Sequence, residues 1–257
     1  FYGADVETFD LYNGTEGDTT LIPSTWHTTT FHLFSSGGCD RVEIANPSVG
    51  LNDITGPIQI LPLAGQTTLW ISDAGNLTGK TATLQRQPSG YERLSGLSFG
   101  NIEWNPAGVD DVYLKTGGGA DTVNVLDTYD RVYLNSAGGV DRVNVGNSYN
   151  GVSDINFQLQ VDNSPSYTTL LIDDGPNLTA RTATLDTVIN GSTYNALTGM
   201  SSGAVMYDSA DIDQVTIRAG SGADTLSIRR STEVLTITNA AGNDTVNLGN
   251  PATGVQG

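Results

Sequence analysis

Residues 110 to 145 read DDVYLKTGGGADTVNVLDTYDRVYLNSAGGVDRVNV, and this stretch contains one short phrase four times. The phrase is an aspartate, any residue, a valine, any residue, and then leucine or valine. It starts at Asp110, Asp121, Asp130 and Asp141, so the gaps between the aspartates are 11, 9 and 11 residues. Every second phrase is therefore 20 residues apart. This spacing predicts a coil of about 20 residues with a strand on each of two sides.

The alternation of side chains along a strand predicts which positions of the phrase face the interior. Successive side chains point to opposite faces, so the two apolar positions of each phrase are expected to point inward. These positions are Val112, Leu114, Val123, Val125, Val132, Leu134, Val143 and Val145. Glycines between the phrases predict tight turns, because glycine adopts positive φ without penalty. They are Gly117, Gly118, Gly119, Gly138 and Gly139.

A longer repeat is superimposed on the short one. The block DQVTIRAGSGADTLSIRRSTEVLTITNAAGNDTVNL begins at Asp213, 103 residues after Asp110. Upstream, residues 67 to 84 match residues 168 to 185 at an offset of 101. We therefore divide the chain into an irregular partial repeat (1–36), two modules (37–138 and 139–241) and the start of a truncated third module (242–257). Because the last segment stops within a module, we expect the natural protein to continue.

The repeats predict an all-β fold, an elongated parallel β-solenoid of tandem modules. Rungs of this kind bury their apolar positions only by stacking on neighbouring rungs. The alternative is a string of tandem β-sandwich domains, since about 100 residues with many short strands is also the size of an immunoglobulin-like domain. The 20-residue inner period favours the solenoid, because a sandwich has no reason to repeat it.

Composition excludes several classes of protein. The formal net charge is -17, which opposes binding to nucleic acid, whose phosphates require Lys and Arg. Cys39 is the only cysteine, so no intrachain disulfide forms. No apolar run is long enough to cross a membrane. The chain opens at Phe1 without a signal peptide, which fits a processed protein or an excised fragment. We expect an extracellular or cell-surface location.

Two glycine-rich stretches suggest a family resemblance. GGGADTVNV, from Gly117, and GSGADTLSI, from Gly220, resemble the glycine and aspartate nonapeptide of RTX proteins. The resemblance implies a β-roll whose turns bind calcium through aspartates and turn carbonyls. Carried over to this chain, the implied calcium ligands are Asp40, Asp121, Asp141, Asp224 and Asp244. The alternative is that each aspartate caps its own turn by accepting backbone N–H groups.

Adjacent acidic residues raise the question of catalysis. Asp110 with Asp111, and Asp173 with Asp174, are pairs of the kind that cleave glycosidic bonds. The pairs do not recur between modules, because Asp111 becomes Gln214 and Asp173 corresponds to Ser72. We therefore predict no catalytic residues.

Five asparagines satisfy the glycosylation sequon N-x-S/T. Asn76 and Asn177 lie at equivalent positions of the two modules and are the stronger candidates; the others are Asn13, Asn190 and Asn243.

Aromatic residues offer a second route to glycans, through stacking of Trp70 and Trp104 on sugars. Leu171 occupies the position of Trp70 in the next module, which favours packing instead.

The function we expect is that of a non-enzymatic extracellular structural or adhesive repeat protein, a building block of a rod or filament. Its expected partners are neighbouring repeats or further copies of the same chain, with glycans as a further candidate. The alternative is a carbohydrate-binding or carbohydrate-cleaving solenoid. A groove lined by aromatics and paired carboxylates would favour that alternative, whereas a featureless rod with matching ends would favour the first.

Overall fold

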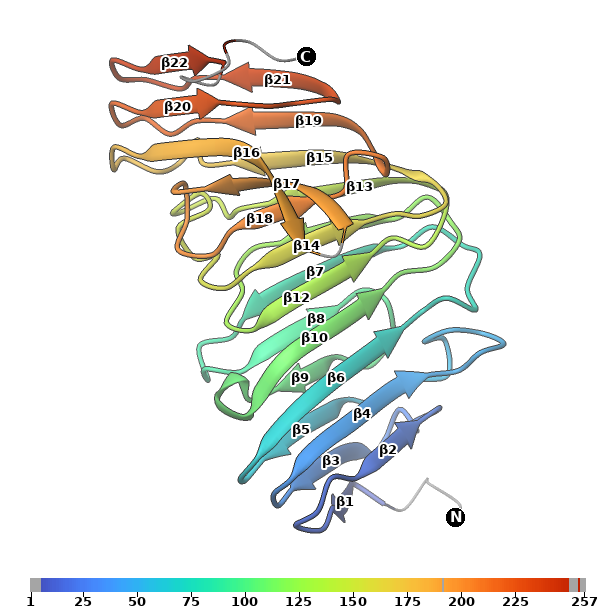
Figure 1. Ribbon diagram of the computed structural model, residues 1–257. Coiled ribbons are helices and arrows are strands. Elements are labelled where there is room, and N and C mark those ends of the chain that lie inside the picture. Colours follow the sequence, from blue (N-terminus) through green and yellow to red (C-terminus); the bar gives the residue numbers. More distant parts are fainter. Residues whose placement is uncertain (1–5, 191, 250–253, 255–257) are drawn as a thin grey trace.

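The computed structural model describes residues 6–190, 192–249 and 254. Two 11-stranded, mostly parallel sheets face each other along the length of the molecule, with the first and the last described strands at opposite ends of the stack (Figure 1). Among the described residues the only helix is the short 3-10 helix η2 (Pro106–Gly108). The all-β solenoid predicted from the sequence is confirmed, and the sandwich alternative is wrong.

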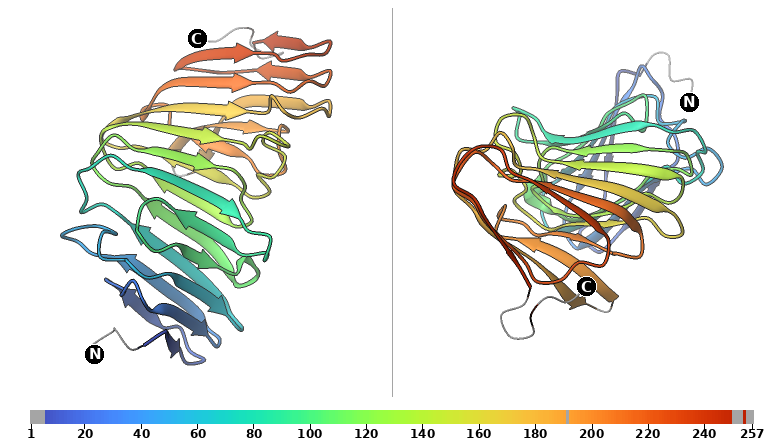
Figure 2. Two further views of the ribbon diagram at one scale, coloured as in Figure 1. Left: turned by 180° about the vertical axis from the view of Figure 1, so that it is seen from behind. Right: turned by 90° about the horizontal axis from the view of Figure 1, so that it is seen from above.

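The strands alternate between the two sheets for most of the chain. In spatial order, sheet A contains β1 (Thr8–Tyr12), β3 (Thr30–Ser35), β5 (Ile58–Pro62), β9 (Ile102–Trp104), β8 (Glu92–Ser95), β7 (Thr81–Arg86), β11 (Thr122–Val125), β13 (Val140–Val145), β15 (Tyr167–Asp173), β19 (Ile212–Arg218) and β21 (Val234–Thr238). Sheet B contains β2 (Thr19–Ile22), β4 (Cys39–Ala45), β6 (Gln66–Ser72), β10 (Val109–Lys115), β12 (Arg131–Asn135), β14 (Leu159–Asp162), β18 (Val205–Tyr207), β17 (Ser192–Thr198), β16 (Thr182–Asn190), β20 (Thr225–Ile228) and β22 (Thr245–Leu248). The strands turn progressively along the stack (Figure 2).

The 20-residue period corresponds to one rung of the coil. Val112 of β10 pairs with Val132 of β12 in sheet B, and Val123 of β11 pairs with Val143 of β13 in sheet A. All eight predicted inward positions of the four phrases are at most 2% exposed. They meet the inward residues of the opposite sheet in one continuous core. The predicted register is therefore confirmed.

Two antiparallel meanders interrupt the parallel coil, which the sequence analysis did not predict. After β6 the chain enters sheet A at β7. It then folds back through β8, which is antiparallel to both β7 and β9, and β9 pairs with β5 in parallel. Strands β16, β17 and β18 repeat this arrangement in sheet B. Gly90, with φ 89°, lies in the first hairpin turn, where a residue with a side chain would be strained.

The long repeat exchanges the two sheets. Strands β4 through β12, nine in number, correspond to β13 through β21. Because the chain changes sheets an odd number of times between β4 and β13, each strand lies in the sheet opposite to its counterpart: β6 is in sheet B, and β15 is in sheet A. The first meander consequently lies in sheet A and the second in sheet B, which leaves both sheets with equal numbers of strands. The module boundaries themselves stay a prediction.

The turn glycines serve two different purposes. Gly139 has φ 91°, as predicted for a turn glycine. Gly117, Gly118 and Gly119 do not have positive φ, so that part of the prediction is wrong. A Cβ added at Gly119 would lie 2.3 Å from the backbone nitrogen of Gly79. Glycine is needed there because the turns of neighbouring rungs pack backbone against backbone.

Candidate functional sites

The five aspartates predicted as calcium ligands form a ladder of bonds between rungs. One carboxylate oxygen of each accepts a backbone N–H from the preceding rung, at 2.7 to 2.9 Å. The donor and acceptor pairs are Asp18 to Asp40, Lys80 to Asp121, Asp121 to Asp141, Arg181 to Asp224, and Asp224 to Asp244. The capping alternative placed such bonds within each turn, whereas all five of these bonds join two rungs.

The ladder places Asp121 and Asp141 on the same side, one rung apart, as their spacing predicted. Both oxygens of each carboxylate already have donors: Asp121 accepts a second N–H, from Gly117, at 3.1 Å, and Asp141 accepts the amide of Asn163 at 2.9 Å. Within the described ranges, no group of three or more His, Cys, Asp or Glu side chains is arranged to hold a metal ion. Calcium binding stays a prediction.

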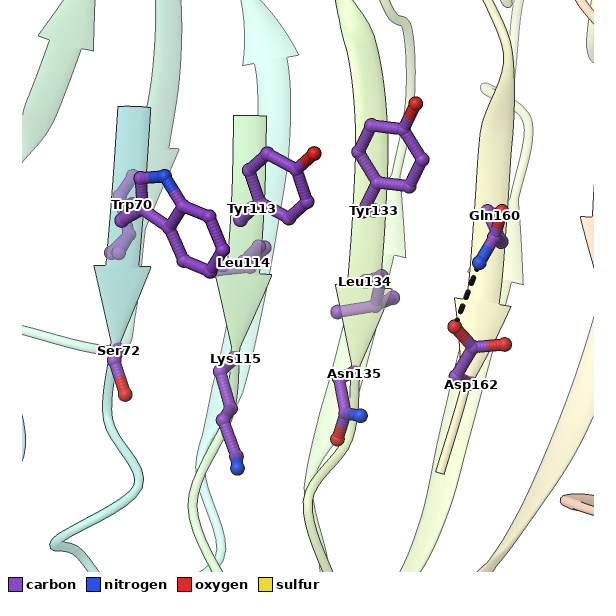
Figure 3. A pocket seen from close by; sticks show the side chains of 11 residues that line it. Trp70, Ser72, Tyr113, Leu114, Lys115, Tyr133, Leu134, Asn135, Gln160 and Asp162 are labelled. Carbon is purple, nitrogen blue, oxygen red and sulfur yellow. Dashed lines mark hydrogen bonds between the residues drawn. The ribbon is translucent and has the colours of Figure 1, made fainter. Parts of the chain in front are cut away.

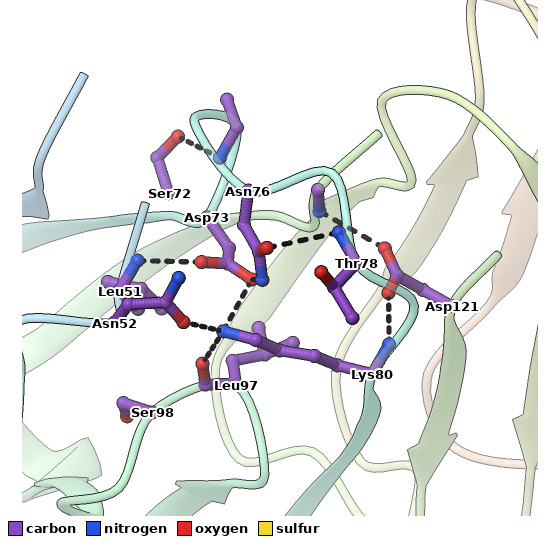
Figure 4. A network of polar contacts seen from close by, with 12 residues as sticks. Leu51, Asn52, Ser72, Asp73, Asn76, Thr78, Lys80, Leu97, Ser98 and Asp121 are labelled. Atoms are coloured by element: carbon purple, nitrogen blue, oxygen red, sulfur yellow. Dashed lines mark hydrogen bonds and ion pairs between the residues drawn. The ribbon is translucent and has the colours of Figure 1, made fainter. Parts of the chain in front are cut away.

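The repeated sequon lies inside a buried polar network (Figure 4). Asn76 is 6% exposed and donates its amide to Asp73 at 3.1 Å. The same carboxylate accepts the N–H of Leu51 at 2.6 Å and pairs with the ammonium of Lys80 at 3.0 Å. Because Asn76 is buried and its amide nitrogen faces Asp73, this geometry disfavours modification of the folded chain.

The second copy of this network has the same architecture. Asn177 is 6% exposed and donates to Asp174 at 3.0 Å, and Asp174 accepts the N–H of Val152. Asp174 therefore joins two turns, and its neighbour Asp173 pairs with Arg218 at 3.4 Å. Asp111 of the other acidic pair binds Arg131 at 2.8 Å.

The remaining sequons differ in accessibility. Asn13 is half-buried and accepts the hydroxyl of Thr20 at 3.1 Å, whereas Asn243 is exposed. The side chain of Asn190 lies outside the described residues. Glycosylation at all five asparagines stays a prediction.

Both ends of the stack leave inward-facing apolar side chains uncovered. In β22, Val246 and Leu248 pair with the buried Leu226 and Ile228 but are themselves 39% and 67% exposed. In β1, Phe9 is 39% exposed. Strands β1 and β21 are the edges of sheet A, and β2 and β22 are the edges of sheet B. In the part of the chain that the structure describes, each end of the stack therefore presents two strand edges and inward apolar side chains without a covering strand.

An aromatic row crosses the outer face of sheet B. Trp70, Tyr113 and Tyr133 occupy paired positions in β6, β10 and β12. Their ring centroids are 4.0 and 4.7 Å apart, with interplanar angles of 8° and 10°. Seen from outside the sheet in Figure 3, the rings are not edge-on. They are therefore stacked with an offset, and each ring turns part of one face outward. The row ends where the guanidinium of Arg41 lies over Trp70, 4.3 Å from the ring centroid.

A polar row runs beside the aromatic one, two residues further along the same strands. It consists of Ser72, Lys115, Asn135 and Asp162. The two rows line a hollow of about 500 Å³ on the face of the sheet (Figure 3). Gln160 limits the hollow at one end, where it donates to Asp162 at 2.9 Å and to the hydroxyl of Tyr194, in the second meander, at 3.0 Å.

Sequence reasoning named Trp70 and Trp104 but missed the rest of this groove. Trp104 is 1% exposed and donates its indole N–H to Asp130 at 2.7 Å, so it belongs to the core. Tyr113 and Tyr133 occupy the variable position between the two inward residues of their phrases. Their spacing of 20 residues was the signal that places them side by side.

Comparison of the chain with protein-family models, with curated proteins and with solved structures finds no match. In the part of the chain that the structure describes, no helix is both long and apolar enough to cross a membrane.

Proposed function

We propose that this protein is a non-enzymatic structural or adhesive component of an extracellular assembly, and that its solenoid is extended by further rungs stacked on its ends, from neighbouring repeats of the same polypeptide or from another copy. The observation that carries the proposal is the last described rung, where Val246 and Leu248 pair with the inward Leu226 and Ile228 and no strand of the described residues covers them. Exposed strand edges with apolar residues pair readily with further strands. Neighbouring rungs of the same kind are the natural complement, because stacking completes both the hydrogen bonds and the core.

The geometry of the two ends is compatible with head-to-tail contact between copies. β21 and β1 are the opposite edges of sheet A, and β22 and β2 are those of sheet B. Placing one copy after another continues each sheet with parallel pairing, β21 on β1 and β22 on β2. A head-to-tail contact that does not close into a ring generates a filament. The partner is therefore a further repeat of this kind.

The resemblance to RTX repeats agrees with this proposal. The glycine and aspartate turns pack rung on rung, as the stack requires, and such repeats belong to large secreted proteins. Glycoside cleavage is not part of the proposal, because it needs two carboxyl groups beside the scissile bond, and the groove on sheet B contributes only Asp162.

Sedimentation velocity and electron microscopy at increasing protein concentration test the stacking. We expect rods that lengthen with concentration, and Leu248→Lys should abolish the lengthening because it places a charge on the open core. Asn247→Lys is the matched control, since Asn247 lies in the same strand but pairs with the outward Ser227. A chain that stays a single short particle at all concentrations, or equal effects of the two variants, would contradict the proposal.

A further inference from the structure

The aromatic row is not a requirement of the fold. The residues equivalent to Trp70, Tyr113 and Tyr133 in the second module are Leu171, Thr216 and Thr236, which pair in the same order on the outer face of sheet A. The strands fold in the same way with an aliphatic side chain and two threonines in these places. The rings of the first module therefore need an explanation other than the stability of the rungs.

The groups beside the rings define the chemistry of a ligand. Lys115 Nζ and Asn135 Nδ2 have no hydrogen-bond partner among the described residues, and both side chains project in the polar row (Figure 3). They offer donors next to partly open ring faces. A pyranose ring has the complementary pattern, with a face of C–H groups that packs on an aromatic ring and a rim of hydroxyls that bonds to polar side chains.

The charge on this face favours an uncharged ligand. Arg131 pairs with Asp111 at 2.8 Å and Arg41 with Glu43 at 2.5 Å, so the charged groups beside the rings are already matched. The charges in the polar row, Lys115 and Asp162, have opposite signs. An acidic glycan would meet no excess of positive charge, in a chain whose formal net charge is -17.

The groove also has the shape that an extended chain needs. Its rows run across the strands, along the axis of the solenoid, and equivalent groups recur at the strand spacing of about 4.8 Å. A hollow of about 500 Å³ lies within the usual size range of ligand sites. From these observations we propose that the groove formed by Trp70, Tyr113, Tyr133, Lys115 and Asn135 binds a neutral, linear polysaccharide that lies along the solenoid axis.

Calorimetric titration of the full chain tests this site with three probes: cellohexaose, mannohexaose and the hexamer of galacturonic acid. We expect at least one neutral hexasaccharide to bind and the acidic one not to bind. The double variant Tyr113→Thr/Tyr133→Thr should weaken binding at least tenfold. Its new residues are those that the second module carries at these positions, so the fold should persist, which circular dichroism checks.

Tyr149→Thr is the control, because Tyr149 is 85% exposed and lies outside the groove. It should leave the affinity unchanged. The proposal is overturned if neither neutral hexasaccharide binds, if only the acidic one binds, or if the double variant binds as tightly as the parent. A change in sedimentation of the double variant without any glycan binding would instead make the row an interface between copies.

Discussion

Glu92 and Asn195 occupy equivalent positions in the two meanders, but their neighbours differ: Asn195 donates a hydrogen bond to a carboxylate, whereas Glu92 lies beside other carboxyl groups. In the second meander the amide of Asn195 donates to Glu233 at 2.9 Å, and the hydroxyl of Tyr207 donates to the same carboxylate. In the first meander Glu92 is 1% exposed and lies near the carboxyl groups of Asp127 and Asp130. Neighbouring buried carboxyl groups resist simultaneous ionisation, so this cluster retains protons.

The protons in this cluster make stability depend on pH. Burial first, and then the charges of Asp127 and Asp130, raise the pKa of Glu92 from 4.5 to about 9. Burial also raises the pKa of Asp130 to about 7, although the indole N–H of Trp104 opposes the shift. The folded chain therefore holds protons that the unfolded chain releases. The contribution of these groups to the free energy of unfolding should be largest at acidic pH. It should fall as pH rises from about 4.5 towards 9.

Glu92→Gln should stabilise the protein at alkaline pH, because an amide cannot ionise and resembles the Asn195 of the second meander. We expect a gain of about 1 to 3 kcal/mol at pH 8, the usual range for relieving an unsatisfied buried group, and little change near pH 4.5. Denaturant unfolding across this pH range measures the effect. Glu16→Gln, at an exposed position, is the control and should leave the pH profile unchanged. A pH profile of Glu92→Gln that parallels the parent would show that Glu92 does not hold the proton.

Val123→Asp and Asn124→Asp test the inward and outward faces of one strand. Val123 is fully buried, so an aspartate there places an unpaired charge in the core and should destabilise by more than about 4 kcal/mol. Asn124 accepts the amide of Asn144 at 2.8 Å on the outer face, and an aspartate keeps that acceptor. Thermal unfolding should show Asn124→Asp close to the parent. Similar losses in the two variants would place the register one residue off.

The rungs were predictable because the inward positions obey a strict period of two within a strand and of 20 between rungs. Val112 and Val132 illustrate this: they hold the same position in two copies of the phrase, 20 residues apart, and they pair on neighbouring strands. The meanders were not predictable in the same way, because a strand such as Glu92–Ser95 is short and its apolar alternation fits parallel or antiparallel pairing equally. The placement of equivalent strands of the two modules in opposite sheets depends on how often the chain changes sheets within a module, and the meanders determine that number.

The candidate sites were harder to predict than the fold, because their chemistry depends on contacts across the stack. The role of Asp121 was sought in its own turn, whereas its shortest bond, to the N–H of Lys80, joins residues 41 positions apart. Asn76 fits a sequon, but its burial against Asp73 is a tertiary feature. The groove is not evident from the tryptophans, because Trp104 is buried in the core; it follows from the 20-residue spacing of Tyr113 and Tyr133, which places them on neighbouring strands.

Excision of residues 37 to 138 tests the exchange of sheets. The deletion removes the nine strands β4 to β12, so β13 should take the place of its counterpart β4 and move from sheet A to sheet B. Because the modules correspond strand for strand, we expect a folded, shorter rod, which circular dichroism and small-angle scattering measure. An unfolded product, under conditions in which the parent is folded, would show that the two modules are not interchangeable.

The aspartate ladder allows the calcium prediction to be tested directly. Asp121 accepts the N–H groups of Lys80 and Gly117, so hydrogen-bond donors already point at both of its oxygens. A cation in the same place would meet the positive ends of those donors, and calcium requires six to eight oxygens. Asp121→Asn should destabilise by about 1 to 3 kcal/mol, because it replaces one acceptor with a donor facing an N–H group.

Millimolar calcium would raise the melting temperature if the folded chain alone bound it with sub-millimolar affinity, since binding to the native state adds to stability. We expect little shift in the parent, because the oxygens of Asp121 are occupied by N–H donors. Differential scanning calorimetry of the parent, Asp121→Asn and Asp173→Asn, with and without calcium, measures this. Asp173 is the control, as its carboxylate pairs with Arg218 at the surface. A calcium-dependent rise that disappears in Asp121→Asn but persists in Asp173→Asn would mean that calcium displaces the N–H donors and stiffens the rod.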